Sequence, residues 1–118
     1  MNKEDKELLL KDLCARLPYG VKIQVPYEDG SGYFDETVWE VNNDGPFYVN
    51  GWGIEYEYVK PYLFPLSSIT KKTLEELNAY IDIKNAYVAV EFFNSHHIDY
   101  RGLIEKGLAI DATGRNIY

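Results

Sequence analysis

The side chains best suited to chemistry gather in one stretch, SHHIDYRGLIEKG, at residues 95–107. Both histidines of the chain, His96 and His97, are followed there by Asp99, Tyr100 and Arg101. An imidazole beside a carboxylate can transfer protons, and an imidazole beside a guanidinium can bind a phosphate. These five residues therefore form the candidate site of an enzyme or a small-ligand-binding protein.

The spacing within this stretch argues against catalysis and against a metal. Adjacent side chains point about 100° apart on a helix and to opposite faces on a strand, so His96 and His97 are poorly placed to share one ion. No serine, cysteine or second carboxylate stands at a recognisable motif distance from them. The residues favour a protein without a catalytic site, metal or cofactor, and the five-residue cluster stays as the alternative site.

The same stretch also has a purely structural interpretation. Asp99 is a favourable N-cap residue for a short helix at 100–106, and Gly107 stands where a left-handed C-cap is needed. Gly102 weakens such a helix by about 1 kcal/mol relative to alanine. We expect Gly102 to mark a close contact with another element of the fold.

The net charge of −7 is concentrated in one segment of the chain. No lysine or arginine occurs between Lys22 and Lys60, whereas eight acids do: Glu28, Asp29, Asp35, Glu36, Glu40, Asp44, Glu55 and Glu57. The segment is also rich in aromatic residues, namely Tyr27, Tyr33, Trp39, Tyr48, Trp52, Tyr56 and Tyr58. An acidic unit of this kind repels phosphates, so direct binding of nucleic acid is not expected.

Two interpretations of the acidic segment stay open. Solvated carboxylates are ordinary on the exposed face of an antiparallel sheet. However, like charges on neighbouring strands are normally relieved by a lysine or arginine, and here the segment contains none. The alternative is a surface that binds a basic protein partner. Its candidate residues are Glu40, Trp52, Glu55, Tyr56, Glu57 and Tyr58.

The elements that must position these residues follow from hydrophobic periodicity. Leucines at helical spacing predict an amphipathic helix at 3–17, with Cys14 on its buried face. Alternating and β-branched runs within 21–59 predict four antiparallel strands in meander order, as an open sheet or curled into a small barrel. Pro61 and Pro65 are expected to end the sheet. The section 67–107 is expected to be mainly helical.

The whole chain of 118 residues is therefore predicted to be one α+β domain, 1–118. Residues 70–81 are expected to form a helix capped by Thr70. Residues 86–97, AYVAVEFFNSHH, fit either a strand or a helix, and the helix is favoured by the resemblance described below.

The sequence lacks both a signal-peptide pattern and a run of about 18 apolar residues, so a cytoplasmic protein is expected, without membrane contact.

Three segments carry a resemblance to a known family: KELLLKDLCARLPYGVK, KPYLFPLSS and HHIDYRGLIEKGLAI. They resemble recurring segments of a family of small uncharacterised proteins of gut bacteria, often encoded in prophages or other mobile elements. Members of that family tend to carry Trp and Leu before the paired histidines in a helical context, whereas this chain has VEFFNSHH. The family has no assigned activity, so the resemblance implies a biological setting and no mechanism.

Two function hypotheses follow from these observations. The first is a non-enzymatic protein-binding or accessory protein of a mobile element or prophage, whose acidic aromatic sheet faces a basic partner. The second is an enzyme or small-ligand-binding protein that uses His96, His97, Asp99, Tyr100 and Arg101. The second requires these side chains to converge on one cleft. The sequence leaves the oligomeric state open.

Overall fold

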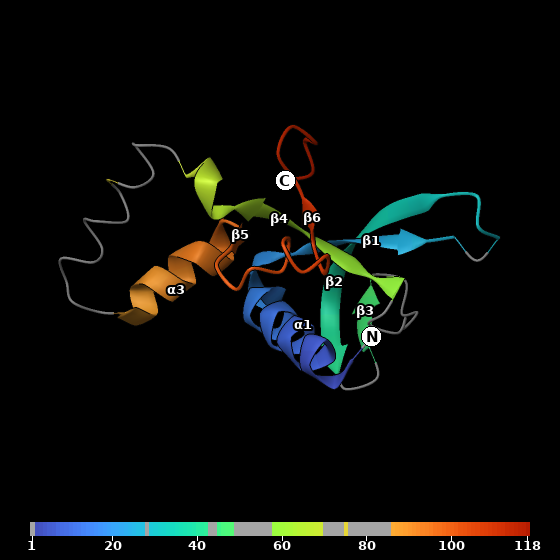
Figure 1. Cartoon of the computed structure of the whole chain (residues 1–118), viewed down its shortest axis with the longest axis horizontal. Coiled ribbons are helices and arrows are strands. Elements are labelled where there is room, and N and C mark those ends of the chain that lie inside the picture. The colour runs from blue at the N-terminus through green and yellow to red at the C-terminus, as the bar shows by residue number, and fades with distance from the viewer. Residues whose placement is uncertain (1, 28, 43–44, 49–57, 70–74, 76–85) are drawn as a thin grey trace.

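The computed structural model describes residues 2–27, 29–42, 45–48, 58–69, 75 and 86–118 (Figure 1). In chain order, the elements are α1 (Lys3–Arg16), the 3-10 turn η1 (Leu17–Tyr19), β1 (Lys22–Pro26), β2 (Tyr33–Asn42), β3 (Gly45–Tyr48), β4 (Lys60–Pro65), the 3-10 turn η3 (Leu66–Ser68), α3 (Ala86–Ser95), β5 (Ile98–Asp99) and β6 (Ile110–Asp111). Helices and a sheet in one chain confirm the predicted α+β class.

The N-terminal helix α1 is confirmed, but its buried face differs from the prediction. Asn2 caps the helix, because its Oδ1 accepts a hydrogen bond from the Asp5 N–H at 2.7 Å. The buried residues are Leu9, Asp12, Leu13 and Arg16, whereas Cys14 is exposed. The prediction of a buried Cys14 was therefore wrong, because the helix is rotated to bring two charged residues inward.

The sheet is mixed rather than purely antiparallel. Its order is β3-β2-β1-β4-β5, and β6 also pairs with β4. The pairs β3–β2, β2–β1 and β1–β4 are antiparallel, while β5 and β6 both run parallel to β4. The first three strands follow one another in the predicted meander order, and β4, which was not predicted, adds to the other edge of β1. The fourth strand of the predicted meander lies mostly outside the described residues. Closure into a barrel stays a prediction.

The strand β4 was missed because it contains two prolines. We expected Pro61 and Pro65 to end the sheet, and the fourth strand to precede them, mostly in a part of the chain outside the described residues. In the structure, Pro61 stands near the start of β4 and Pro65 at its last position. Between them, the Phe64 N–H still donates to the His97 carbonyl at 2.8 Å. Prolines at strand ends remove few ladder hydrogen bonds.

The hairpin of β1 and β2 projects from the body of the molecule as an arm (Figure 1). The Tyr27 N–H donates to the Gly32 carbonyl across this hairpin, so the preceding residue, Pro26, faces the other edge of β1. Among the described residues, β4 pairs with that edge only at Ile23 and Gln24. Because proline has no N–H, Pro26 leaves the uncovered edge without a donor there, which disfavours pairing with a foreign strand.

The main hydrophobic core lies between α1 and one face of the sheet. Alternate residues of β1 are buried, as the predicted alternation required. The core cluster consists of Leu9, Leu13, Val21, Ile23, Val25, Val38, Val59, Leu63, Leu103, Leu108 and Ala109. Leu103 and Leu108 come from the turn after β5, so this turn is part of the core although it is not a regular helix.

The described residues of the section 67–107 are helical in α3 but not after it. α3 confirms that residues 86–95 are helical. β5 and a compact turn follow it, so the short helix expected at 100–106 is absent. The helix expected at 70–81 lies outside the described residues, apart from Glu75, which is helical.

Candidate functional site

The buried face of α1 carries an ion pair that the sequence analysis did not single out. Asp12 and Arg16 are both 0% exposed and stand four residues apart. Arg16 Nε donates to Asp12 Oδ2 at 2.9 Å, and its Nη2 lies 3.2 Å from Asp12 Oδ1. Such fork-like contact between a guanidinium and a carboxylate is among the stronger hydrogen-bonded pairs in proteins.

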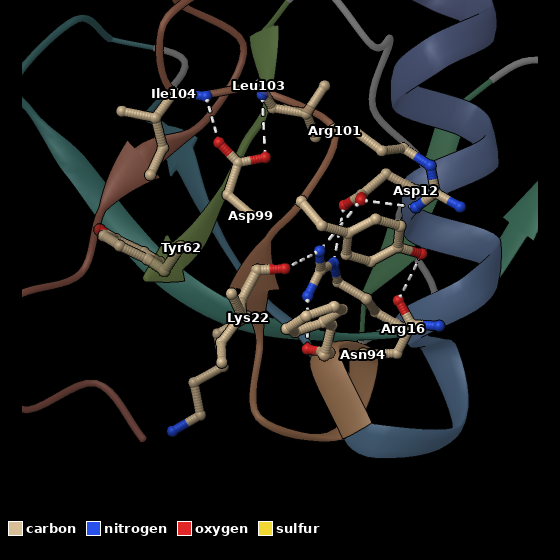
Figure 2. Close-up of polar contacts among 12 residues, drawn as sticks. Asp12, Arg16, Lys22, Tyr62, Asn94, Asp99, Arg101, Leu103 and Ile104 are labelled. Atoms are coloured by element: carbon tan, nitrogen blue, oxygen red, sulfur yellow. Dashed lines mark hydrogen bonds and ion pairs between the residues drawn. The ribbon is translucent and has the colours of Figure 1, made fainter. Parts of the chain in front are cut away.

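Arg16 also joins α1 to α3 and to β5. Its Nη2 donates to the Ile98 carbonyl at 2.5 Å, and its Nη1 donates to the Phe93 carbonyl at 3.3 Å. Figure 2 shows the guanidinium of Arg16 at the centre of this group of contacts. One buried side chain therefore fixes the positions of three elements relative to one another.

Arg101 approaches the same carboxylate from the turn after β5. Its Nη1 donates to Asp12 Oδ1 at 2.8 Å, and its side chain is 15% exposed (Figure 2). Both guanidinium groups also lie over the ring of Tyr100, at 4.5 Å for Arg101 and 5.4 Å for Arg16. Because both oxygens of Asp12 accept hydrogen bonds from guanidinium groups, this carboxylate is poorly placed to act as a general base.

His97 is buried on another side of this group. It is 6% exposed, and its ring stacks on Tyr118 with centroids 3.8 Å apart and planes 11° from parallel. Its Nδ1 is buried and has no hydrogen-bond partner among the described residues. Burial, followed by the nearby charges of Arg16 and His96, lowers the pKa of His97 from 6.5 to about 4. The imidazole is neutral at pH 7.

His96 points elsewhere, although it is the adjacent residue. It is exposed, its ring stacks on Phe92 at 4.2 Å, and its Nδ1 lies 2.9 Å from the Phe92 carbonyl oxygen. His97 instead has a backbone φ of +55°, which turns the chain sharply between the two imidazoles. The histidines therefore diverge, as their adjacency in the sequence indicated.

Asp99 caps the turn that follows β5. Its Oδ1 accepts a hydrogen bond from the Leu103 N–H and its Oδ2 accepts one from the Ile104 N–H, both at 2.9 Å (Figure 2). At the other end, the N–H groups of Gly107 and Leu108 donate to Ile104 and Leu103 carbonyls, as in the Schellman motif of a helix end. The capping residues were identified correctly, but they enclose only a single turn.

The alternative five-residue site is thus distributed over several structural roles. His97, Tyr100 and Arg101 lie around Arg16, whereas His96 faces away and Asp99 is occupied by backbone N–H groups. No group of three or more histidine, cysteine, aspartate or glutamate residues in the described part of the chain could hold a metal ion. This arrangement favours structural roles over acid–base chemistry.

The acidic aromatic segment is described in part, and its described residues are mostly exposed. Tyr27, Tyr33 and Tyr58 are 48%, 64% and 55% exposed. Asp29, Asp35 and Glu40 are exposed as well. Four of the six predicted partner-binding residues, Trp52, Glu55, Tyr56 and Glu57, lie outside the described residues.

Two residues of the buried group, Asp12 and Arg16, were missed by sequence reasoning. Their signal was present, since Asp12 and Arg16 each follow one of the leucines Leu9 and Leu13 by three residues, a spacing that places all four on one face of a helix. A charged pair on a helix is usually solvated, so the residue types alone do not indicate burial. Tyr118 had no signal in the sequence, because its contacts with β1 and β4 are long-range.

Comparison with protein-family models, with curated proteins and with solved structures found no match in any of the three. Within the described ranges, no helix has both the length and the apolar character needed to cross a membrane.

Proposed function

We propose that this protein is a non-enzymatic binding protein whose acidic aromatic surface faces a basic protein partner. The described residues of this surface are Tyr27, Asp29, Tyr33, Asp35, Glu40 and Tyr58. The other predicted members, Trp52, Glu55, Tyr56 and Glu57, lie outside the described residues. The observation that carries the proposal is the exposure of the three described tyrosines, in a segment without any basic residue. Exposed aromatic side chains supply contact area, and uncompensated carboxylates supply selectivity for a basic surface.

Two neighbouring side chains on β2, those of Tyr33 and Asp35, support this proposal. Tyr33 and Asp35 follow one another on the same face of β2, because side chains alternate along a strand. Asp35 also accepts a hydrogen bond from the Tyr62 hydroxyl at 2.5 Å, which holds its carboxylate in place. A fixed carboxylate next to an exposed aromatic ring loses little conformational entropy when a partner binds.

The biological setting is a separate part of the proposal. The resemblance of three segments to proteins of gut bacteria suggests an accessory protein of a prophage or mobile element, acting in the cytoplasm. The enzyme alternative receives less support, because His96 diverges from His97 and Asp99 caps a turn.

The decisive experiment is a binding measurement with charge-reversed variants. The full chain is used to capture partners from its native host at low ionic strength, and the affinity of each captured protein is then measured. Replacing Glu40, Glu55 and Glu57 by lysine should weaken binding at least about tenfold, since like charges facing each other across an interface cost several kcal/mol. Added salt should weaken wild-type binding as well.

A matched control separates a specific surface from general charge. Glu4, Glu7 and Glu105 are exposed acids outside the segment, and their replacement by lysine changes the net charge equally. Binding should survive in this control. If both triple variants lost the same binding affinity, or if the affinity of the wild-type protein did not depend on salt concentration, the acidic aromatic surface would not be the binding site.

A further inference from the structure

Residues 113–118, called the strap below, follow β6 and contact β1 and β4 through Ile117 and Tyr118. The strap starts from a turn in which Asp111 Oδ1 accepts a hydrogen bond from the Thr113 N–H at 2.9 Å. Residues 113–116 are exposed. Exposed backbone with few buried contacts belongs to the part of a fold that opens most easily. The contacts at the far end of the strap therefore decide whether it stays closed.

Tyr118 provides most of these contacts. Its hydroxyl accepts a hydrogen bond from the Lys22 N–H at 2.8 Å and donates one to the Tyr62 carbonyl at 2.8 Å. The Lys22 ammonium group donates to the Ile117 carbonyl at 2.9 Å. The residue as a whole is 42% exposed, but burial of its hydroxyl raises the pKa of Tyr118 above the ordinary value. The hydroxyl is thus inserted between β1 and β4.

The ring of Tyr118 closes over His97. The two rings are stacked, His97 is 6% exposed, and its buried Nδ1 finds no hydrogen-bond partner within the described ranges. A proton added to this imidazole would create a charge next to the guanidinium of Arg16, and its buried Nδ1 has no acceptor among the described residues. Solvation of such a charge requires that water reach the ring. The ring of Tyr118 covers one face of the imidazole, so opening of the strap would let water reach it.

We propose that the strap is a pH-sensitive latch, which is closed over His97 while the imidazole is neutral and opens when the imidazole takes up a proton. Opening exposes His97 together with the Lys22 N–H and the Tyr62 carbonyl. Several ionisable groups of the described residues surround the latch. They are Asp12 and Arg16 of α1, Lys22 of β1, Tyr62 of β4, Asp99 of β5, His96, and Arg115 and Tyr118 of the strap itself.

The balance of these groups sets the direction of the effect. Asp12 is already paired with two arginines and Asp99 with two backbone N–H groups, so neither carboxylate is free to stabilise a charged His97. The pKa of His97 is lowered to about 4 in the closed state and returns towards 6.5 when the strap is open. The open state then binds more protons, and closure weakens as the pH falls from 6.5 towards 4. Between about pH 7 and about pH 5, the open-to-closed ratio should rise by at most roughly twentyfold.

Amide hydrogen exchange on the full chain tests the latch directly. The Lys22 N–H donates to Tyr118, whereas the Val38 N–H donates to the Val21 carbonyl within the core sheet. The protection factor of Lys22 should fall by up to roughly twentyfold between about pH 7 and about pH 5, while that of Val38 should change little. A constant Lys22 protection factor in the wild-type protein would overturn the proposal.

Two variants assign the effect to His97. His97→Asn removes the titrating group, and asparagine tolerates the positive φ at this position. It should abolish the pH dependence at Lys22, whereas His96→Asn should retain it. An unchanged pH dependence in His97→Asn would assign the effect to another group and sink the proposal.

A reciprocal measurement keeps the test valid if His97→Asn does not fold. In Tyr118→Ala, the pKa of His97 measured by NMR should rise from about 4 towards 6.5, because strap closure and protonation are linked. Tyr33→Ala, which removes another exposed tyrosine ring, should leave that pKa in place. Equal His97 titration in Tyr118→Ala and in the wild-type protein would show that the strap does not control the imidazole.

Discussion

At the scale of single residues, the unusual feature is a charged pair in the middle of an apolar helix face. Asp12 and Arg16 share that face with Leu9 and Leu13, and all four are 0% exposed. Removing two charges from water is expensive, so a buried pair contributes less to stability than its close contact implies. Its value here is positional, since a purely apolar face would not specify which carbonyl groups of the 93–98 backbone must face α1.

This view predicts a large difference between single and double substitutions. Asp12→Ala leaves Arg16 buried without its carboxylate and should lower the free energy of unfolding by about 3–5 kcal/mol. The double variant Asp12→Leu with Arg16→Met removes both charges and should cost clearly less than the single one. Urea denaturation of the three proteins measures both quantities.

The surface ion pair of the same helix provides the control. Lys3 and Glu7 have the same spacing of four residues, but their side chains are 88% and 65% exposed. Glu7→Ala should therefore change the free energy of unfolding by less than about 1 kcal/mol. A double variant as unstable as Asp12→Ala would mean that the positions need charge for a reason other than pairing.

At the scale of elements, the sequence predicted α1 and the antiparallel strands β1 and β2 from periodicity alone. It predicted the wrong one of two overlapping stripes of α1 as the buried face, the stripe that carries Cys14. The stripe of Leu10, Cys14 and Leu17 is fully apolar, whereas the buried stripe includes Asp12 and Arg16. Partners far away in the sequence make the second stripe favourable: the carbonyl groups of Phe93 and Ile98 for Arg16, and the guanidinium of Arg101 for Asp12.

In the turn after β5, the two capping residues were predicted correctly, but the helix predicted between them was not formed. The capping roles of Asp99 and Gly107 were predictable because caps depend on local residue chemistry. The helix between them was not formed, because Gly102 adopts a φ of +76° that interrupts helical geometry. A β carbon at Gly102 would meet nothing within 4 Å, so the predicted close contact there was wrong.

This geometry makes Gly102 and Gly107 sensitive to substitution for a conformational reason. Gly107 has a φ of +74°, and its β carbon would also meet nothing within 4 Å. Replacement of either glycine by alanine should therefore lower the free energy of unfolding by about 1–2 kcal/mol through backbone strain alone. Replacement by asparagine should cost less, since asparagine adopts positive φ more readily. Chemical denaturation distinguishes this cause from a steric one, for which asparagine would cost more than alanine.

At the scale of the whole molecule, the described apolar residues form two clusters of unequal size. The larger joins α1, the sheet and the 103–109 turn. The smaller contains Phe92 and Ile98, with Ile69 and Phe93 packed on it. Polar contacts join the two parts: Arg16 donates to the Phe93 carbonyl, and the Tyr19 hydroxyl donates to Glu91. Because the smaller cluster buries less apolar surface, α3 should be able to separate from the sheet before the rest unfolds.

Hydrogen exchange measured over a series of guanidinium concentrations tests this hierarchy. The amides of α3 should exchange through an opening with a lower free energy and weaker denaturant dependence than those of β1 and β2. Arg16→Lys preserves the charge but loses the planar fork that reaches two carbonyls, so it should lower the protection of α3 more than that of β1. Lys11→Arg, at an exposed position of the same helix, should affect neither. If α3 and β1 followed one common exchange curve, the molecule would be a single cooperative unit, and Arg16 would stabilise all of it rather than the contact between its two parts.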